Sequence, residues 1–215
     1  MSQNLLILIG SPKAKNSTSN LISKNLEKKL TSYNLNFSKL YLFTELHHED
    51  VLLEKLAAAD TLILISPVYE NSVPSTVLQF FELAAQHKEK LAIQNKLFFT
   101  ITLTGFADTA AGKTTINSCK LFSETMHFSW LGGITTSPSA LIEDEDLGKM
   151  YAGLNTSLDL FAKSLSQNMP LPPEIGELNA KSILPSFIYR IIGSIYQKKP
   201  IKTIGKEAFY AKPLI

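Results

Sequence analysis

Short apolar runs alternate with segments of helical periodicity along most of the chain. The run Leu5–Ile9 is apolar at every position, which is typical of a strand buried on both faces of a parallel sheet. After it, Leu21, Ile22, Leu26 and Leu30 recur at helical spacing. The same alternation predicts four further strands, at residues 37–42, 61–65, 96–103 and 131–136. It also predicts four further helices, at residues 51–59, 75–86, 114–127 and 146–167.

Five alternations of strand and helix predict an α/β fold, an open and mostly parallel sheet covered by helices on both faces. Five strands favour the sheet order 2-1-3-4-5 over the six-stranded order of dinucleotide-binding folds. We assign residues 1–169 to this domain and residues 170–215 to a C-terminal extension.

The extension differs from the domain in amino-acid composition. Pro170-Leu-Pro-Pro173 ends the last predicted helix, residues 183–196 are rich in aromatic and branched side chains, and Gln197-Lys198-Lys199 follows. A helix packed on its own domain or on a partner subunit is the favoured interpretation. Two others stay open: a peripheral membrane anchor, because aromatic residues beside lysines suit a headgroup boundary, and a flap over the active site of a neighbouring chain.

Composition narrows the function classes. The chain has 215 residues, with 21 basic and 19 acidic ones, and therefore lacks the basic excess of a nucleic-acid-binding protein. Its single cysteine, Cys119, excludes an intramolecular disulfide and a cysteine-only metal or iron–sulfur site on one chain. There is neither a signal-peptide pattern nor an apolar run of the ~18–20 residues that span a bilayer, so we expect a cytoplasmic protein.

The loop after the first predicted strand has the character of an anion site. In an open parallel sheet, ligands bind at the carboxyl ends of the strands where the strand order reverses, here between the first and third strands. Residues 10–19 leave the first strand and lead into a helix N-terminus, whose free N–H groups and dipole favour an anion. Hydroxyl and ammonium groups gather in this loop, on Ser11, Lys13, Lys15, Ser17, Thr18 and Ser19. Helix capping would explain one or two of the hydroxyls, and a bound phosphate explains the set better.

The loop after the third predicted strand, residues 66–75, offers a place for a planar ligand. Two prolines restrict its backbone, and Tyr69 presents a flat amphipathic ring at the tip of the sheet, next to Asn71. The alternative is a rigid turn that exposes a tyrosine by accident.

Together, "GSPKAKNSTSNL" and "SPVYENSVPSTVLQFFE" resemble the NAD(P)H-dependent FMN reductase group of the flavodoxin-like superfamily, over roughly residues 4–165. The resemblance implies a bound FMN whose phosphate is held by Ser11, Lys13, Ser17, Thr18 and Ser19. It implies that the isoalloxazine is lined by Pro67, Val68, Tyr69, Asn71 and Ser72. It also implies that the loop after the fourth strand, Thr102 to Phe106, meets the pyrimidine edge of the flavin, and that the protein is a homodimer. We expect main-chain N–H groups around Thr104, Gly105 and Phe106 to stabilise the negative charge of the reduced flavin.

The activity that this resemblance implies is hydride transfer from NAD(P)H through FMN to a small acceptor: a quinone, a flavin, a nitro or azo compound, or a metal ion. Two other classes stay open, a one-electron carrier of the flavodoxin type and a flavin-free binding module on the same fold.

The stretch from Ala107 to Thr114 matches a loosened phosphate-loop pattern of ATP- and GTP-binding proteins. Ala107 replaces the first glycine, and neither the third nor the fifth strand ends in an acidic residue that could hold Mg²⁺. The match also follows the fourth strand, away from the point where the strand order reverses. We therefore predict that the match is coincidental and that this stretch is not a nucleoside-triphosphate site.

Overall fold

The computed structural model describes residues 3–91, 95–105, 109–145, 147–148 and 151–180, and residues 187–188, 191 and 193–195 of the extension. Three predictions concern residues that lie wholly or partly outside these ranges: the flavin contact of Phe106, the start of the phosphate-loop-like match at Ala107, and the interpretation of residues 183–196.

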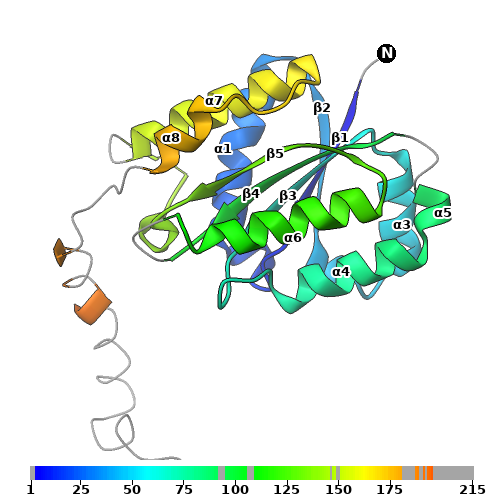
Figure 1. Ribbon diagram of the computed structural model, residues 1–215, viewed down its shortest axis with the longest axis horizontal. Helices are drawn as coiled ribbons and strands as arrows, with labels where there is room; N and C mark the ends of the chain where they lie inside the picture. Colours follow the sequence, from blue (N-terminus) through cyan, green and yellow to red (C-terminus); the bar gives the residue numbers. More distant parts are fainter. Residues whose placement is uncertain are drawn as a thin grey trace, which may run out of the picture.

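The sheet has five parallel strands in the order β2-β1-β3-β4-β5, which confirms the predicted fold class and strand order (Figure 1). The strands are β1 (Asn4–Ile9), β2 (Asn36–Tyr41), β3 (Thr61–Pro67), β4 (Leu97–Leu103) and β5 (Ser129–Thr136). Strands β1, β3 and β4 lie inside the sheet and are almost wholly buried, as their mainly apolar sequences predict.

Helices cover both faces of the sheet, again as predicted (Figure 1). One face carries α1 (Thr18–Ser32), α7 (Ala152–Gln167) and α8 (Glu174–Ala180). The other carries α2 (Leu42–Glu45), α3 (Glu49–Ala58), α4 (Ser75–Gln86), α5 (Lys88–Leu91) and α6 (Gly112–Thr125). Two short 3₁₀ helices, η1 (Ala14–Asn16) and η2 (Ser139–Leu141), follow β1 and β5.

Side chains of the central strands point alternately into two separate cores. In β1, Leu5, Ile7 and Ile9 pack toward α1 and α7, while Leu6 and Leu8 pack toward α3 and α4. Two filled cores fix the sheet between its helical layers, so the loops at the carboxyl ends of the strands stand on a rigid base.

The last long helix begins later than the sequence predicts. The predicted start at residue 146 is wrong, because α7 begins at Ala152. The acidic run Glu143-Asp-Glu-Asp146 has the composition of a helix N-terminus. However, the Glu145 carboxylate lies 2.5 Å from Lys24 Nζ and 3.4 Å from Lys28 Nζ on α1. The hydrogen bond from Lys24 lowers the pKa of Glu145. These ion pairs tie Glu145, which is not part of a helix, to α1.

The first part of the extension packs against the domain. The N–H of Leu171 donates to the carbonyl of Leu131 in β5 at 2.8 Å, and Asn179 Nδ2 donates to Ser157 Oγ in α7 at 2.6 Å. A Cβ at Gly153 would lie 2.8 Å from the carbonyl oxygen of Leu178, so glycine allows α8 to approach α7 closely. In the described ranges, no helix combines the length and the apolar character needed to cross a membrane.

Candidate functional site

The loop that follows β1 begins at Gly10, whose backbone is held by hydrogen bonds to β3 and α4. The N–H of Gly10 donates to Ile65 O of β3 at 2.9 Å, and Thr76 Oγ1 of α4 donates to Gly10 O at 2.8 Å. A Cβ at Gly10 would lie 2.5 Å from Val77 Cγ2 and 3.0 Å from Ser66 Oγ. Only glycine fits this gap without displacing α4.

Ser17 is the N-cap of α1. Its Oγ accepts from the N–H of Asn20 at 3.2 Å and donates to the carbonyl of Ala14 at 2.6 Å. The Ser17 hydroxyl is therefore committed to the helix start, which is the capping role that the sequence left open for one or two of the hydroxyls.

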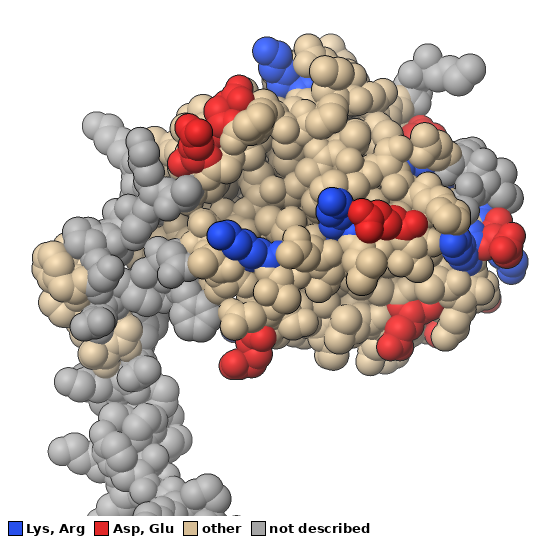
Figure 2. Space-filling view, viewed as in Figure 1, with Lys and Arg blue, Asp and Glu red and all other residues tan. Residues whose placement is uncertain are grey.

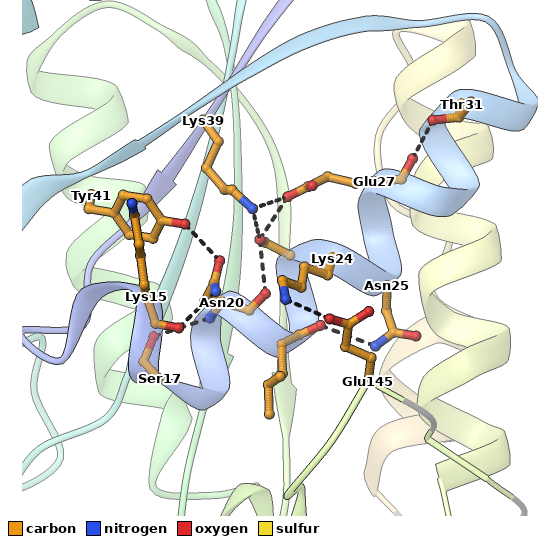
Figure 3. Close-up of polar contacts among 12 residues, drawn as sticks. Lys15, Ser17, Asn20, Lys24, Asn25, Glu27, Thr31, Lys39, Tyr41 and Glu145 are labelled. Carbon is orange, nitrogen blue, oxygen red and sulfur yellow. Dashed lines mark hydrogen bonds and ion pairs between the residues drawn. The ribbon is translucent and has the colours of Figure 1, made fainter.

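Asn20 links the first loop to strand β2 (Figure 3). Its Nδ2 donates to the carbonyl of Lys15 at 2.9 Å, and its Oδ1 accepts from the Tyr41 hydroxyl at 3.1 Å. Farther along α1, Glu27 forms an ion pair of 2.6 Å with Lys39 of β2. Because Tyr41 ends β2 and Asn20 lies in the first turn of α1, these bonds hold the loop to two rigid elements.

Three hydroxyl groups of the loop keep the capacity to donate. Ser11 Oγ accepts from the N–H of Lys13 at 3.3 Å, and its own proton has no acceptor within the described ranges. The hydroxyls of Thr18 and Ser19 make no hydrogen bond to any residue that the structure describes, although Ser19 is only 2% exposed. The N–H groups of Thr18 and Ser19 lie in the first turn of α1, where a helix leaves its N–H groups without intrahelical acceptors.

The loop that follows β3 is a tight two-residue turn. Tyr69 and Ser72 exchange two backbone hydrogen bonds, both of 2.9 Å, and the intervening Glu70 and Asn71 have φ values of 49° and 59°. Positive φ at both central residues is the signature of a type I′ turn, a conformation in which glutamate is uncommon. The Tyr69 ring is 45% exposed at the tip of the sheet.

The third loop, after β4, is tied to the end of β5. The N–H of Thr104 donates to Thr136 O at 3.0 Å, and the N–H of Ser139 donates to Thr104 O at 2.8 Å. The Thr104 N–H is thus already bonded, contrary to the expectation that it would meet the flavin. The adjacent Gly105 has open space where a Cβ would stand.

These loops enclose a cavity of about 520 Å³ at the point where the strand order reverses. Nine of the residues predicted from sequence line it: Ser11, Lys13, Ser17, Thr18, Ser19, Pro67, Val68, Tyr69 and Gly105. Three predicted residues do not: Asn71, Ser72 and Thr104. Leu103, which lies in the predicted loop Thr102–Phe106, also lines it, and four lining residues were missed: Asn16, Glu70, Ser139 and Ala140. Glu70 sits between predicted neighbours, and the loop after the fifth strand was the signal that could have indicated Ser139 and Ala140.

Gly112 and Cys119 have roles in packing, and the described residues offer no metal site. A Cβ at Gly112 would overlap the side chain of Thr135, so the close approach of α6 to β5 requires the glycine of the phosphate-loop-like match. Cys119 is buried, and burial raises the pKa of its thiol to about 12, which leaves it protonated and unreactive near neutral pH. Among the residues that the structure describes, no cluster of histidine, cysteine and carboxylate side chains could hold a metal ion.

The sheet order, the two helical layers and the loop geometry define a flavodoxin-like protein. Solved structures agree at the level of the fold. A flavone reductase covers 99% of this chain and 99% of its own, with 10% identity and a TM-score of 0.62. A flavodoxin, WrbA-like protein from Agrobacterium tumefaciens covers 78% of this chain and 97% of its own, with 13% identity and a TM-score of 0.57. An FMN-dependent NADH-azoreductase from Bacillus anthracis, solved in complex with FMN, covers 76% of this chain and 99% of its own, with 13% identity and a TM-score of 0.58.

The chain belongs to the NADPH-dependent FMN reductase family, whose pattern it matches over residues 4–137. No curated protein sequence matches it significantly. Family membership makes the chain a flavin-dependent oxidoreductase that works with FMN.

The residues of the cavity fit FMN. The hydroxyls of Thr18 and Ser19, which have no partner among the described residues, and the N–H groups of a helix N-terminus are donors of the kind that bind a phosphate group. A volume of about 520 Å³ lies within the range of cofactor sites. The aromatic ring of Tyr69 and the apolar Val68 and Leu103 line the same cavity, where a flat ring system needs apolar surface.

Proposed function

We propose that this chain is a reductase that oxidises NAD(P)H with FMN held in the cavity between the loops after β1, β3 and β4, and that it reduces a small acceptor. The observation that carries the proposal is the cavity at the strand-order reversal, which joins unpaired donors from the first loop to the turn around Tyr69. When bound, FMN supplies the redox chemistry, by accepting a hydride from the nicotinamide and passing electrons to a second substrate.

The first loop is assigned to the phosphate. Ser11, Thr18 and Ser19 would donate hydroxyl hydrogen bonds, and Lys13 would add positive charge from the exposed rim. Ser17 would act indirectly, because its hydroxyl caps α1 and so keeps the first-turn N–H groups pointed at the ligand.

The second and third loops are assigned to the ring system. Pro67, Val68 and Tyr69 would flank the isoalloxazine, and Gly105 would let its edge approach the backbone closely. Glu70 carries a carboxylate on the wall of the cavity and would disfavour acceptors with negative charge. The type I′ turn fixes the backbone of Glu70 next to that of Tyr69.

The acceptor belongs among quinones, flavins, nitro or azo compounds and metal ions. Support for an azo compound comes from the fold neighbour that is an azoreductase. A homodimer remains a prediction from the family resemblance.

Absorption spectroscopy of the purified protein under anaerobic conditions tests the function. We expect an oxidised-flavin spectrum that NADH or NADPH bleaches within seconds and that an added acceptor restores. A yellow protein that neither nucleotide bleaches would instead be an electron carrier, and a protein that binds no FMN would be a flavin-free module.

A charge substitution tests the phosphate assignment. Thr18→Glu places a carboxylate among the donors of the first loop, so we expect a folded protein that has lost its FMN. Thr31→Glu is the matched control, because Thr31 is exposed in the last turn of the same helix (Figure 3). If Thr18→Glu keeps its FMN as well as Thr31→Glu does, the phosphate lies elsewhere.

A further inference from the structure

The extension displays large apolar side chains that the domain leaves uncovered. Phe187, Ile191 and Ile195 are 65%, 57% and 56% exposed, and all three are helical. They are spaced four residues apart, and this spacing places side chains on one side of a helix. We call these three residues the C-terminal apolar face. In Figure 1 the described pieces of this segment, drawn in orange, lie away from the sheet and its helical layers.

The same part of the sequence concentrates positive charge. Residues 181–215 contain seven basic residues and one acidic residue, a net charge of +6. Residues 1–180 contain 14 basic and 18 acidic residues, a net charge of −4. The seven basic residues are Lys181, Arg190, Lys198, Lys199, Lys202, Lys206 and Lys212. The near-neutral total thus conceals a strongly basic extension.

The domain does not offer a matching anionic surface on the face that Figure 2 shows. Its acidic and basic side chains are interspersed there. Several carboxylates of the described domain are already paired within the chain, such as Glu27 with Lys39, Asp159 with Lys29, and Glu145 with Lys24. On this face, a second copy would therefore meet the basic extension with dispersed and partly neutralised charge.

We propose that the extension docks on an anionic lipid surface, with the C-terminal apolar face at the boundary between headgroups and acyl chains. Apolar side chains on one helix side, flanked in sequence by four to eight lysines or arginines, are the chemistry that binds such surfaces. The apolar face supplies the insertion, and the lysines that follow it supply the attraction to the anionic headgroups. Attachment is peripheral and reversible, and it is independent of the FMN site.

Vesicle sedimentation with the full-length protein tests this proposal. We expect binding to phosphatidylcholine vesicles that contain about one third phosphatidylglycerol, and little binding to phosphatidylcholine alone. Binding should fall steeply in about 1 M salt, where charges are screened over ~3 Å.

Two pairs of substitutions separate the contributions of charge and apolar surface. Lys198→Gln with Lys199→Gln should weaken binding to anionic vesicles by about 30-fold, or roughly five-fold for each charge removed. Ile191→Gln with Ile195→Gln should weaken it by more than about ten-fold.

Matched control substitutions on the domain show whether any loss of vesicle binding is specific to the extension. Lys90→Gln with Lys163→Gln removes two exposed charges outside the extension, and Leu121→Gln removes an apolar side chain that is 63% exposed on α6. Both controls should bind as the unmodified protein does, and thermal unfolding should show that every variant is folded.

Three results would overturn the proposal. The first is equal binding to neutral and anionic vesicles, or no binding to either. The second is a loss of binding in the domain controls as large as that in the extension variants. The third, seen by light scattering without vesicles, is a dimer that Ile191→Gln with Ile195→Gln converts to monomer, because the apolar face would then belong to a subunit interface.

Discussion

Asn20 should control how well the first loop is organised for a phosphate. The substitution Asn20→Leu keeps a side chain of similar size but removes both polar contacts, the 2.9 Å bond to Lys15 O and the 3.1 Å bond from Tyr41. Asn20 itself lines no part of the cavity, so the effect on FMN would pass through the loop.

The size of the effect follows from the two lost bonds. Each neutral hydrogen bond contributes about 0.5–1.5 kcal/mol, so the organised loop should lose roughly 2 kcal/mol relative to other conformations. Only the organised loop binds phosphate well, and the apparent affinity falls with its population. We expect the Kd for FMN to rise by up to about 30-fold in Asn20→Leu, the full factor applying when the organised loop becomes the minor state. Tyr41→Phe removes one bond and should raise it by about five-fold.

Quenching of FMN fluorescence on titration with the apoprotein measures the Kd directly. Asn25→Leu is the matched control, because Asn25 is 8% exposed in the same helix and its amide donates to Leu21 O, away from the loop (Figure 3). Asn25→Leu removes one such bond and should lose about half as much unfolding free energy as Asn20→Leu, but it should keep its FMN affinity. Equal loss of affinity in the two variants, or none in either, would refute the reasoning.

Three further substitutions test other features. Gly10→Ala should lower the unfolding free energy by about 1–3 kcal/mol, because its methyl group would overlap Val77 Cγ2 at 2.5 Å. Adding Val77→Ala to this variant should restore much of the loss. If the losses of the two single variants simply add in the double variant, the two side chains do not clash. Thr115→Val should raise the thermal midpoint, because it removes a buried hydroxyl without a partner in the described ranges, a group that costs about 1–3 kcal/mol; a lower midpoint would show that this hydroxyl has a partner. Burial raises the pKa of Tyr151 from 10.0 to about 12. The neutral phenol therefore contributes up to about 2–3 kcal/mol to the free energy of unfolding below pH 10, and this contribution is lost as the pH rises to 12. In chemical denaturation, Tyr151→Phe should lose less unfolding free energy over this pH range than the unmodified protein; equal losses in the two proteins would place the cause elsewhere.

The fold was predictable because its strands are buried on both faces. A strand such as Leu5–Ile9 must be apolar at every position, and few other structures require this pattern in a chain with regular helical segments between the runs. The start of α7 was not predictable from local pattern. Four consecutive acidic residues resemble a helix N-terminus, whereas Glu145 is held by Lys24, a residue more than a hundred positions earlier in the sequence.

The cavity was predictable from the strand order, but the role of each hydroxyl in it was not. Ser17 and Thr18 are chemically similar neighbours, and only the backbone geometry makes the first a cap and leaves the second without a partner among the described residues. Glu70 was missed because sequence preferences do not favour glutamate in a turn with positive φ. Thr104 was assigned a free N–H because its bond to Thr136 depends on the exact end of β5.

The hydrogen bond from Leu171 to Leu131 has a consequence for how the chain behaves in a crowded solution. Strand β5 is the last of the sheet, and a strand in that position offers its open side to any other extended peptide. The chain that follows α7 covers part of this side with its own backbone. A protein truncated after residue 169 would expose this edge of β5 and should self-associate more readily. We therefore expect the beginning of the extension to reduce aggregation.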